Sequence, residues 1–377
     1  MAAPPISTAP PVQPPPDERE RDALAKIARV RAQTPRFRDE RITMAHGAGG
    51  KATTSLIQGL IAPAFKSNLQ SIVLNPLDDA AVIEVGGAEL ALTTDAFVVK
   101  PLRFPGGSIG DLAVNGTLND LAVAGARPVA LTLTLVLEEG LSSEVLRAEI
   151  EAIAHAAAAA GVEIVAGDTK VVERGHADGM YITTTGLGHR DPRARLSPAS
   201  IRPGDRVLVS GRIGDHGTAI MLARGEFELD ALIESDTRCL WPAVDALLEA
   251  VGPDLRCMRD ATRGGVASVL NELAQASGVA MLVREERIPV HPSVMGACEL
   301  LGIDPMYVAN EGKLVAVVAA EAADAALAAL RSVPGCEEAA EIAEVKGDPP
   351  GMVLVQTAFG GRRVMDVLVG DPLPRIC

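Results

Sequence analysis

The sequence is poor in aromatic residues, with six phenylalanines, two tyrosines and one tryptophan among 377 residues. A chain with so few aromatics offers no stacking platform for single-stranded nucleic acid. Basic residues are outnumbered as well, because 35 lysines and arginines face 49 aspartates and glutamates and leave a net charge of −14. This charge repels phosphate polymers, so the composition argues against a nucleic-acid partner, while the carboxylates can hold divalent metal around a small anionic ligand.

Long apolar runs are lacking too, since no uninterrupted hydrophobic stretch reaches the roughly 18 residues that a membrane-spanning helix needs. The N-terminal PPISTAPPVQPPPDERERD is rich in proline and charge and has no apolar signal-peptide core. The five cysteines are odd in number and include no CxxC pair, which argues against a disulfide framework or a structural zinc site. We therefore expect a soluble, cytoplasmic protein with no membrane partner.

The chain is nevertheless 48% hydrophobic and long enough for two cores. Residues 1–40 are predicted to be a disordered, proline-rich extension. Residues 41–190 alternate β-branched runs (81–85, 90–94, 129–136, 162–165 and 181–187) with helical patterns over 108–125 and 142–160, which predicts an N-terminal α/β domain.

Periodicity is lost over 189–204, which gathers proline and arginine and marks a domain junction. A second α/β domain is predicted over 191–345. It has strands at 206–210 and 313–319 and helices near 214–224, 266–276, 293–301 and up to residue 330. Residues 346–377 are predicted to form short strands, at 352–356 and 364–369, and a flexible tail. The fold class is thus two-domain α/β (α+β).

Acidic and amide side chains recur through the first domain, at Asp78 and Asp79 in NPLDDAAV, at Asp95 in LTTDAF, and within GDLAVNGTLNDLAVAGA. In the last segment Asp111, Asn115 and Asn119 are four residues apart and form one polar stripe on an otherwise apolar helix. Burying such groups costs several kcal/mol unless they are paired, and hydrated magnesium bridging ATP phosphates would be a suitable partner. A stripe that faces solvent is the alternative.

The glycine-rich HGAGGK at 46–51 is not a Walker A loop, because alanine stands at position 45 in place of the first glycine and Ala52 replaces the magnesium-binding hydroxyl residue. Any ATP site here has another geometry. Glycines that form a tight turn before a helix over 54–60 explain the segment equally well.

Three further segments carry candidate groups. GDTKVVERG places Asp168, Thr169 and Lys170 directly after the strand that ends near residue 166, where loops often collect ligand groups, although a surface lysine explains Lys170 nearly as well. DATRGG at 260–265 puts a carboxylate, a hydroxyl and an arginine ahead of a helix, which suits anions. Glu311 in ANEGK is either a positioned base or an exposed turn residue.

The chain ends in PRIC, so the thiol of Cys377 shares a terminus with the α-carboxylate. We expect this terminus to be mobile, which suits a swinging carrier thiol; an inert cysteine in a disordered tail is the alternative.

Taken together, HGAGGK, NPLDDAAV, TTDAF, GTLNDLAVAGARP, GDTKVV, DATRGG, ANEG and the terminal PRIC resemble the HypE family of hydrogenase maturation factors. The resemblance covers residues 42–377 and leaves the N-terminal extension outside. The wider superfamily comprises ATP-dependent synthetases related to aminoimidazole ribonucleotide synthetase, selenophosphate synthetase and thiamine-monophosphate kinase. It implies a two-domain fold in which the N-terminal domains form a dimeric β-barrel and the C-terminal domain is an α/β sandwich.

The resemblance also implies the activity and its partners. ATP would drive dehydration of a carbamoyl group on the terminal thiol to a thiocyanate, the source of the cyanide ligands of [NiFe]-hydrogenase iron. The expected partners are a HypF-like carbamoyltransferase that loads the cysteine, the HypC–HypD complex that receives cyanide, and a second copy in a homodimer.

Residue roles follow from this resemblance. Cys377 is the covalent carrier, Lys170 orients or neutralises the transferred phosphoryl group, and Glu311 is the candidate base for the nitrogen proton. Metal and phosphate binding is assigned to several acidic and polar residues, with Mg²⁺ on four of them (Asp79, Asp95, Asp120 and Asp260) and ATP contacts extending to Asp78, Asn119, Asp168 and Thr169. The neighbouring carboxylate disfavours the Cys377 thiolate, so we expect either that Arg375 offsets that charge or that docking on the partner lowers the pKa of the thiol.

Two other functions fit parts of the sequence. A selenophosphate synthetase-like enzyme usually has a reactive cysteine near its N-terminus, whereas no cysteine precedes Cys239 here, and a thiamine-monophosphate kinase-like enzyme has no need of a terminal cysteine. A non-catalytic carrier that presents Cys377 to a partner is the remaining alternative.

Overall fold

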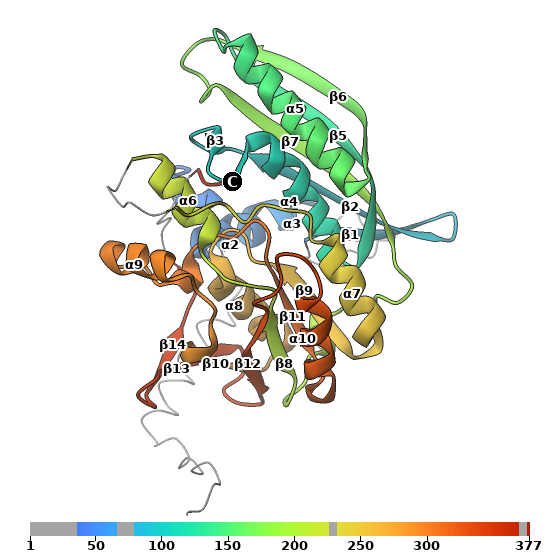
Figure 1. The fold of residues 1–377 in the computed structure, drawn as a ribbon, viewed down its shortest axis with the longest axis vertical. Helices are drawn as coiled ribbons and strands as arrows, with labels where there is room; N and C mark the ends of the chain where they lie inside the picture. Colours follow the sequence, from blue (N-terminus) through green and yellow to red (C-terminus); the bar gives the residue numbers. More distant parts are fainter. Residues whose placement is uncertain (1–35, 66–78, 226–231, 369–374) are drawn as a thin grey trace, which may run out of the picture.

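The computed structural model describes residues 36–65, 79–225, 232–368 and 375–377, in which two sheets follow one another along the chain (Figure 1). The first sheet has the order β1-β2-β7-β5-β6, with β5 and β6 parallel and the other neighbours antiparallel. Its strands are β1 (Ala81–Val85), β2 (Ala88–Phe97), β5 (Ala126–Glu138), β6 (Glu163–Val172) and β7 (Met180–Arg190). A small hairpin, β3 (Arg103–Phe104) with β4 (Gly107–Ser108), follows β2.

Two helices, α4 (Ile109–Val123) and α5 (Ser143–Ala160), cover one face of the first sheet (Figure 1). Both begin at a serine cap, since the hydroxyls of Ser108 and Ser142 accept N–H groups of the first helical turn. Gly161, with φ +68°, ends α5 in the left-handed conformation that glycine adopts without strain. The helical patterns predicted over 108–125 and 142–160 are confirmed.

The other face of the first sheet is not covered by any helix of the described residues. Residues of β7 alternate between the two faces: Ile182 and Thr184 are fully buried under the helices, while Tyr181 and Leu187 on the opposite face are only half-buried. The neighbouring β2 presents Leu92 on the same uncovered face, and this side chain is 42% exposed. We call this surface the open face of the first sheet.

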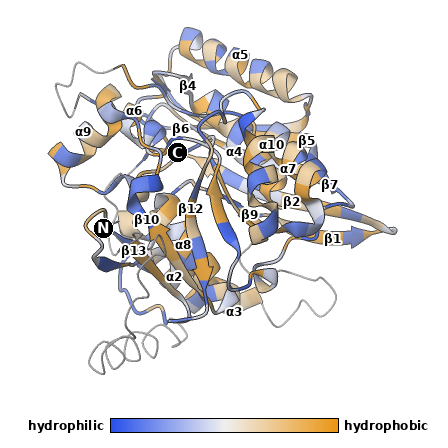
Figure 2. Cartoon of the chain, turned by 60° about the horizontal axis from the view of Figure 1, so that its bottom comes forward, coloured by the Kyte–Doolittle hydropathy of each residue, from blue (hydrophilic) through white to orange (hydrophobic). Residues whose placement is uncertain are grey.

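The second sheet has seven strands in the order β14-β13-β10-β12-β8-β11-β9. They are β8 (Arg206–Val209), β9 (Leu255–Asp260), β10 (Ala280–Arg284), β11 (Leu314–Val318), β12 (Ala340–Lys346), β13 (Met352–Gln356) and β14 (Arg362–Met365). Alternate residues of β8 enter different cores: Val207 packs with α8 (Gly265–Ser277), and Leu208 packs with α7 (Trp241–Val251) and α10 (Ala323–Arg331). Helices therefore cover both faces, and Figure 2 shows apolar residues along α8 and the strands around it.

The remaining helices flank the junction of the two halves. Helix α6 (Asp215–Ala223) packs on α9 (Pro292–Leu301) and joins the core of the first sheet. Near the N-terminal end of the described chain lie α2 (Lys51–Leu56), a π-helical turn (Ile57–Ile61) and α3 (Ala62–Phe65). Within the described ranges, no helix is long and apolar enough to cross a membrane.

The chain has the predicted α/β class, but several elements differ from the sequence prediction. Strands β9, β10 and β12 and helix α7 were not predicted, because short strands such as LRCMRD interrupt the apolar pattern with charge. The strand expected at 364–369 is β14, which lies earlier. The helix expected at 54–60 begins at Lys51 and passes into the π-helical turn. The domain boundaries at residues 40, 190 and 345 stay predictions.

Candidate active site

Four aspartates from four different elements meet where the two halves of the chain join. Asp79 precedes β1, Asp95 lies in β2, Asp120 in the last turns of α4, and Asp260 ends β9. Burial raises the pKa of Asp120 well above its ordinary value, and the charges of Asp260, Asp79 and Asp95 raise it further. Burial and the charges of Asp79 and Asp95 likewise raise the pKa of Asp260. These mutual effects indicate that the four carboxylates form one electrostatic cluster; that they bind a metal stays a prediction.

Two side chains contact the carboxylates of the acidic cluster. The Thr93 hydroxyl donates to Asp120 at 2.8 Å, and Arg259 pairs with Asp79 at 3.1 Å. Among the described residues, no three acidic, histidine or cysteine side chains stand close enough together to form a ready-made metal site. Oxygen ligands whose mutual repulsion favours protonation nevertheless suit a hard divalent cation, because the cation replaces the protons that otherwise neutralise them. The donor set therefore fits Mg²⁺, which would draw the carboxylates together.

Glu311 adjoins this cluster from the turn before β11. Only 2% of the residue is exposed, and its Oε1 atom is buried without a hydrogen-bond partner. Burial raises the pKa of Glu311 well above its ordinary value, with further increases from Asp260 and Asp95. The alternative of an exposed turn glutamate is thus wrong, and a buried carboxylate with a free oxygen aimed at a cluster of this kind is a candidate proton acceptor.

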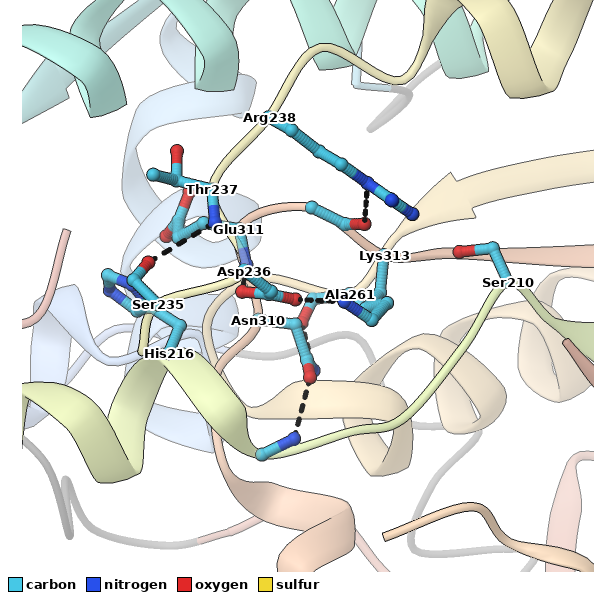
Figure 3. A network of polar contacts seen from close by, with 12 residues as sticks. Ser210, His216, Ser235, Asp236, Thr237, Arg238, Ala261, Asn310, Glu311 and Lys313 are labelled. Carbon is cyan, nitrogen blue, oxygen red and sulfur yellow. Dashed lines mark hydrogen bonds and ion pairs between the residues drawn. The ribbon is translucent and has the colours of Figure 1, made fainter. Parts of the chain in front are cut away.

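A buried ion pair supports the Glu311 turn. Asp236 accepts the backbone N–H of Glu311 at 2.9 Å and pairs with Lys313 at 2.9 Å, as Figure 3 shows. Burial alone would raise the pKa of Asp236, but the charge of Lys313 and the hydrogen bonds from Lys313 and the Glu311 N–H outweigh it, so the pKa is lowered and Asp236 remains ionised. Gly312 allows the close approach, since a Cβ there would stand 1.8 Å from the Asp236 carbonyl oxygen. The segment around Asp236 therefore fixes where Glu311 lies.

The C-terminal residues are docked against this region. Ile376 forms an antiparallel bridge with Val99, directly after β2, and is only 6% exposed. The backbone N–H of Val98 donates to the Cys377 oxygen at 2.9 Å. Cys377 lines a cavity of about 240 Å³ together with residues of the HGAGGK and DATRGG segments. The chain end was expected to be mobile and free, but in this structure it rests inward.

Arg263 joins the Cys377 cavity to the acidic cluster. Its guanidinium lines the cavity and donates to the Gly47 carbonyl at 3.1 Å, which brings DATRGG and HGAGGK together. The charge of Cys377 is the main cause that raises the pKa of Arg263, with smaller increases from Asp95, Glu311 and Asp120. The cation expected beside Cys377 was Arg375. That side chain instead pairs with Asp178 at 2.7 Å, and Arg263 faces the cysteine.

The GDTK segment does not lie in the loop that the sequence predicted. Asp168, Thr169 and Lys170 occupy the middle of β6 and not a loop after it, because the strand continues to Val172. Asp168 in β6 and Ala96 in β2 lie on the open face at the same level of the sheet, and strands β5 and β7 separate them. Three strand spacings amount to about 14 Å, so these residues do not reach the cavity that Ala96 lines. Lys170 is exposed and pairs with Asp168 at 2.6 Å.

Two other predictions on ATP contacts stay predictions. Asp78 lies outside the described residues. Asn119 is buried, but its amide donates to the carbonyls of Arg238 and Glu311, each at 3.0 Å, and accepts the N–H of Leu240 at 2.8 Å. Asn115 and Asn119 of the polar stripe of α4 thus contact the chain segment at 237–240, and the Asp111 carboxylate accepts a hydrogen bond from the Ser108 hydroxyl.

Sequence reasoning missed the polar residues Ser235, Asp236 and His216. They lie at non-periodic positions and their partners are distant in sequence, so only the run of Ser, Asp and Thr at 235–237 signals a loop with local hydrogen bonding.

Comparisons with known proteins bear on the whole chain. Residues 77–189 match the N-terminal domain of the AIR synthase related proteins, and residues 202–355 match the C-terminal domain of the same family. A carbamoyl dehydratase HypE from Rhodobacter capsulatus is 47% identical over 341 residues, which is 90% of this chain and 99% of that protein. The HypE from Cupriavidus necator is 50% identical over 337 residues, 89% of this chain and 95% of that protein.

The chain is also similar to solved structures of HypE proteins. A HypE–HypF complex contains a chain with 44% sequence identity and a TM-score of 0.76, covering 82% of this chain and 99% of that one. A HypE in complex with ATP has 43% identity and a TM-score of 0.74, covering 89% of this chain and 100% of that one. A thiamine-monophosphate kinase complex at 22% identity and a TM-score of 0.61, covering 84% of this chain and 96% of that one, shares the fold.

Proposed function

Because this chain belongs to the HypE family of carbamoyl dehydratases, we propose that it dehydrates a carbamoyl group on the Cys377 thiol to a thiocyanate, driven by ATP. The product supplies the cyanide ligands of the iron centre in [NiFe]-hydrogenase. The observation that supports this function most directly is the docked terminus: Cys377 and Arg263 line one cavity, and the charges of Cys377, Asp95, Glu311 and Asp120 all raise the pKa of Arg263. These observations support a single site that contains the carrier thiol and the acidic groups.

The chemistry requires an oxygen to leave as phosphate. The carbamoyl oxygen of Cys377–S–C(=O)NH₂ attacks the γ-phosphorus of ATP, ADP departs, and one of the two nitrogen protons passes to solvent, which gives an iminophosphate. Loss of the remaining nitrogen proton then expels phosphate and leaves Cys377–S–C≡N. Phosphoryl transfer depends on positioning and charge stabilisation, and Arg263 at the cavity offers a fixed positive charge for the transferred group.

We assign the divalent cation to Asp79, Asp95, Asp120 and Asp260. Mg²⁺ bound there would neutralise phosphate charge, and the raised pKa values of Asp120 and Asp260 support this assignment because they report unbalanced negative charge.

Glu311 is our candidate for the base that accepts the nitrogen proton. Burial makes its ionised form a stronger base than an exposed carboxylate, and its Oε1 atom has no other hydrogen-bond partner. Asp236 and Lys313 keep its backbone in place through the contacts described above.

Lys170 can serve this site only from a second copy of the chain. It lies on the open face of the first sheet, about three strand spacings from the cavity of its own chain. We propose a homodimer in which two open faces pack together and complete a barrel, so that Lys170 of the partner subunit approaches the phosphates. The exposed apolar side chains on this face, Leu92 among them, support this assembly.

Leu92→Glu is expected to dissociate the homodimer, because it buries two charges at a twofold apolar contact without partners. Sedimentation velocity at micromolar concentration should then report mainly monomer. The matched control is Leu300→Glu on α9, whose residue is 72% exposed and lies away from the open face; it should leave the dimer intact. An unchanged dimer for Leu92→Glu would place the interface elsewhere.

A HypF-like carbamoyltransferase is the proposed partner that loads Cys377, since a HypE chain of similar sequence forms a complex with HypF. The HypC–HypD complex is proposed as the acceptor of the cyanide. Loading on a large partner requires the docked terminus to leave its cavity, and the cytoplasm is the proposed compartment.

Asp120→Asn separates this enzyme from a non-catalytic carrier. Asparagine keeps the hydrogen bond from Thr93 but removes one negative charge from the acidic cluster. We expect ATP turnover to fall about tenfold, with the unfolding temperature equal to or above that of the unaltered protein because charge repulsion is relieved. Phosphate release under saturating Mg-ATP measures this. Unchanged turnover would favour the carrier, with catalysis on another protein.

A further inference from the structure

The C-terminal tail is anchored by a buried histidine that has no part in the chemistry derived above. His216 on α6 is fully buried, and its Nε2 atom lies 2.5 Å from the carbonyl oxygen of Ile376. Its Nδ1 atom lies 2.8 Å from the Ser235 hydroxyl. Because a carbonyl only accepts, Nε2 carries the proton and donates, and Nδ1 accepts from Ser235.

The state of this imidazole is well defined. Burial lowers the pKa of His216, while Asp236 and the bond to Ile376 raise it less, so the ring is neutral near pH 7. Phe104 packs edge-on against it, with ring centroids 5.6 Å apart. The neutral ring holds the Ile376 carbonyl by a hydrogen bond and not by an ion pair. Such a bond is suited to a contact that must form and break.

The same histidine reaches the segment that positions the candidate base. Ser235, its second partner, is followed by Asp236, which accepts the Glu311 N–H and pairs with Lys313, as Figure 3 shows. The Ser235 backbone is itself tied to Pro105 at 2.8 Å. A continuous chain of contacts therefore runs from the Ile376 carbonyl through His216 and Ser235 to the Glu311 turn.

We propose that His216 is a positioning residue that latches the inward tail, so that Cys377 is presented to the site only while the Ile376 carbonyl is bound to Nε2. This proposal rests on the proposed function, because the tail needs to leave its cavity only if Cys377 is loaded on another protein. Other contacts also hold the tail: the backbone N–H groups of Val98 and Lys100 donate to Cys377 and Arg375, Arg224 donates to the Arg375 carbonyl, and Arg375 pairs with Asp178. The Arg224 and Arg375 side chains are not buried, whereas His216 is fully buried and contacts the carbonyl directly before the cysteine, so it is the buried side chain that can tune the dock.

The first test measures access to Cys377. His216→Ala removes one buried hydrogen bond, and the inward state should lose about fivefold in its equilibrium constant. Alkylation of Cys377 by iodoacetamide, followed by peptide mass mapping, should accelerate by about that factor. His216→Gln, which can still donate to Ile376, should restore most of the protection. His155→Ala on the exposed face of α5 is the matched control and should alkylate at the unaltered rate.

The second test separates a latch from a general structural role. The loss of unfolding temperature in His216→Ala is measured in the full chain and in a chain that lacks residues 375–377. A latch predicts that most of the loss disappears with the tail; an equal loss in both chains, together with unchanged alkylation, would overturn the proposal. If His216→Ala does not fold, Ser235→Ala, which removes the partner that orients the ring, takes its place in both measurements.

Neither measurement needs dehydratase activity, so the latch and the proposed function can fail separately. In an active enzyme, His216→Ala should also slow single-turnover dehydration of the carbamoylated protein while speeding its loading. A purely structural defect would slow both steps, and that outcome would contradict a latch. Faster alkylation in a protein that forms no thiocyanate even when unaltered would uphold the latch and refute the function.

Discussion

Glu311→Gln is expected to lower the rate of thiocyanate formation by about 10²- to 10⁴-fold, the range in which a positioned general base contributes. Glutamine keeps the shape of the side chain in a site where the residue is only 2% exposed, but it cannot take the nitrogen proton of the iminophosphate. Carbamoylation of Cys377 and binding of ATP should be unaffected, because neither step uses this carboxylate. Single-turnover mass spectrometry of carbamoylated protein after addition of Mg-ATP measures the rate.

The control for this substitution is Glu151→Gln, which neutralises an exposed glutamate on α5 and should leave the rate unchanged. A burst of phosphate release in Glu311→Gln without thiocyanate would place the defect after phosphoryl transfer, as the assignment requires. Dehydration within a few-fold of the unaltered rate would mean that another group accepts the proton.

Lys313→Met is expected to destabilise the fold by about 3–5 kcal/mol, the usual effect of removing one partner from a buried ion pair. The Lys313 and Asp236 side chains are only 7% and 4% exposed, so the remaining Asp236 carboxylate would be left uncompensated in a buried position. Chemical denaturation monitored by circular dichroism gives the free energy of unfolding. Because Asp236 holds the Glu311 N–H, dehydration should also slow in the fraction that remains folded.

The double variant Asp236→Asn with Lys313→Met tests the cause. Asparagine can still accept the N–H of Glu311 but carries no charge, so the double variant should be more stable than Lys313→Met alone. If the double variant is instead less stable than the single one, the ion pair is not what stabilises this turn, and the loss in Lys313→Met reflects packing of the lysine stem.

Sequence patterns predicted most of the first domain because its elements are long and periodic. The helices at α4 and α5 begin at serine caps and α5 ends at Gly161, which are local signals readable without tertiary contacts. The second sheet was harder, since β9 and β12 mix charged residues into strands that only cross-strand neighbours make stable.

In the candidate site, too, some residues could be predicted from the sequence and others could not. Asp79, Asp95, Asp120 and Asp260 could be proposed from their motifs and the family resemblance, and their mutual effects on the pKa values of Asp120 and Asp260 support that grouping. The position of Lys170 could not be predicted, because the strand that carries it extends past the expected end and turns a presumed loop into an exposed surface. The inward tail depends on His216, Val98 and Val99, residues with no sequence pattern that connects them to the terminus.

The central claim is that Cys377 carries the group that ATP dehydrates. The most direct measurement is the intact mass of the protein after incubation with a carbamoyl-donating partner and carbamoyl phosphate, before and after addition of Mg-ATP, beside Cys377→Ala. The account predicts a carbamoyl adduct that loses the mass of one water only with ATP, and no adduct on Cys377→Ala. ATP turnover without any adduct, under conditions in which the partner is active, would contradict it.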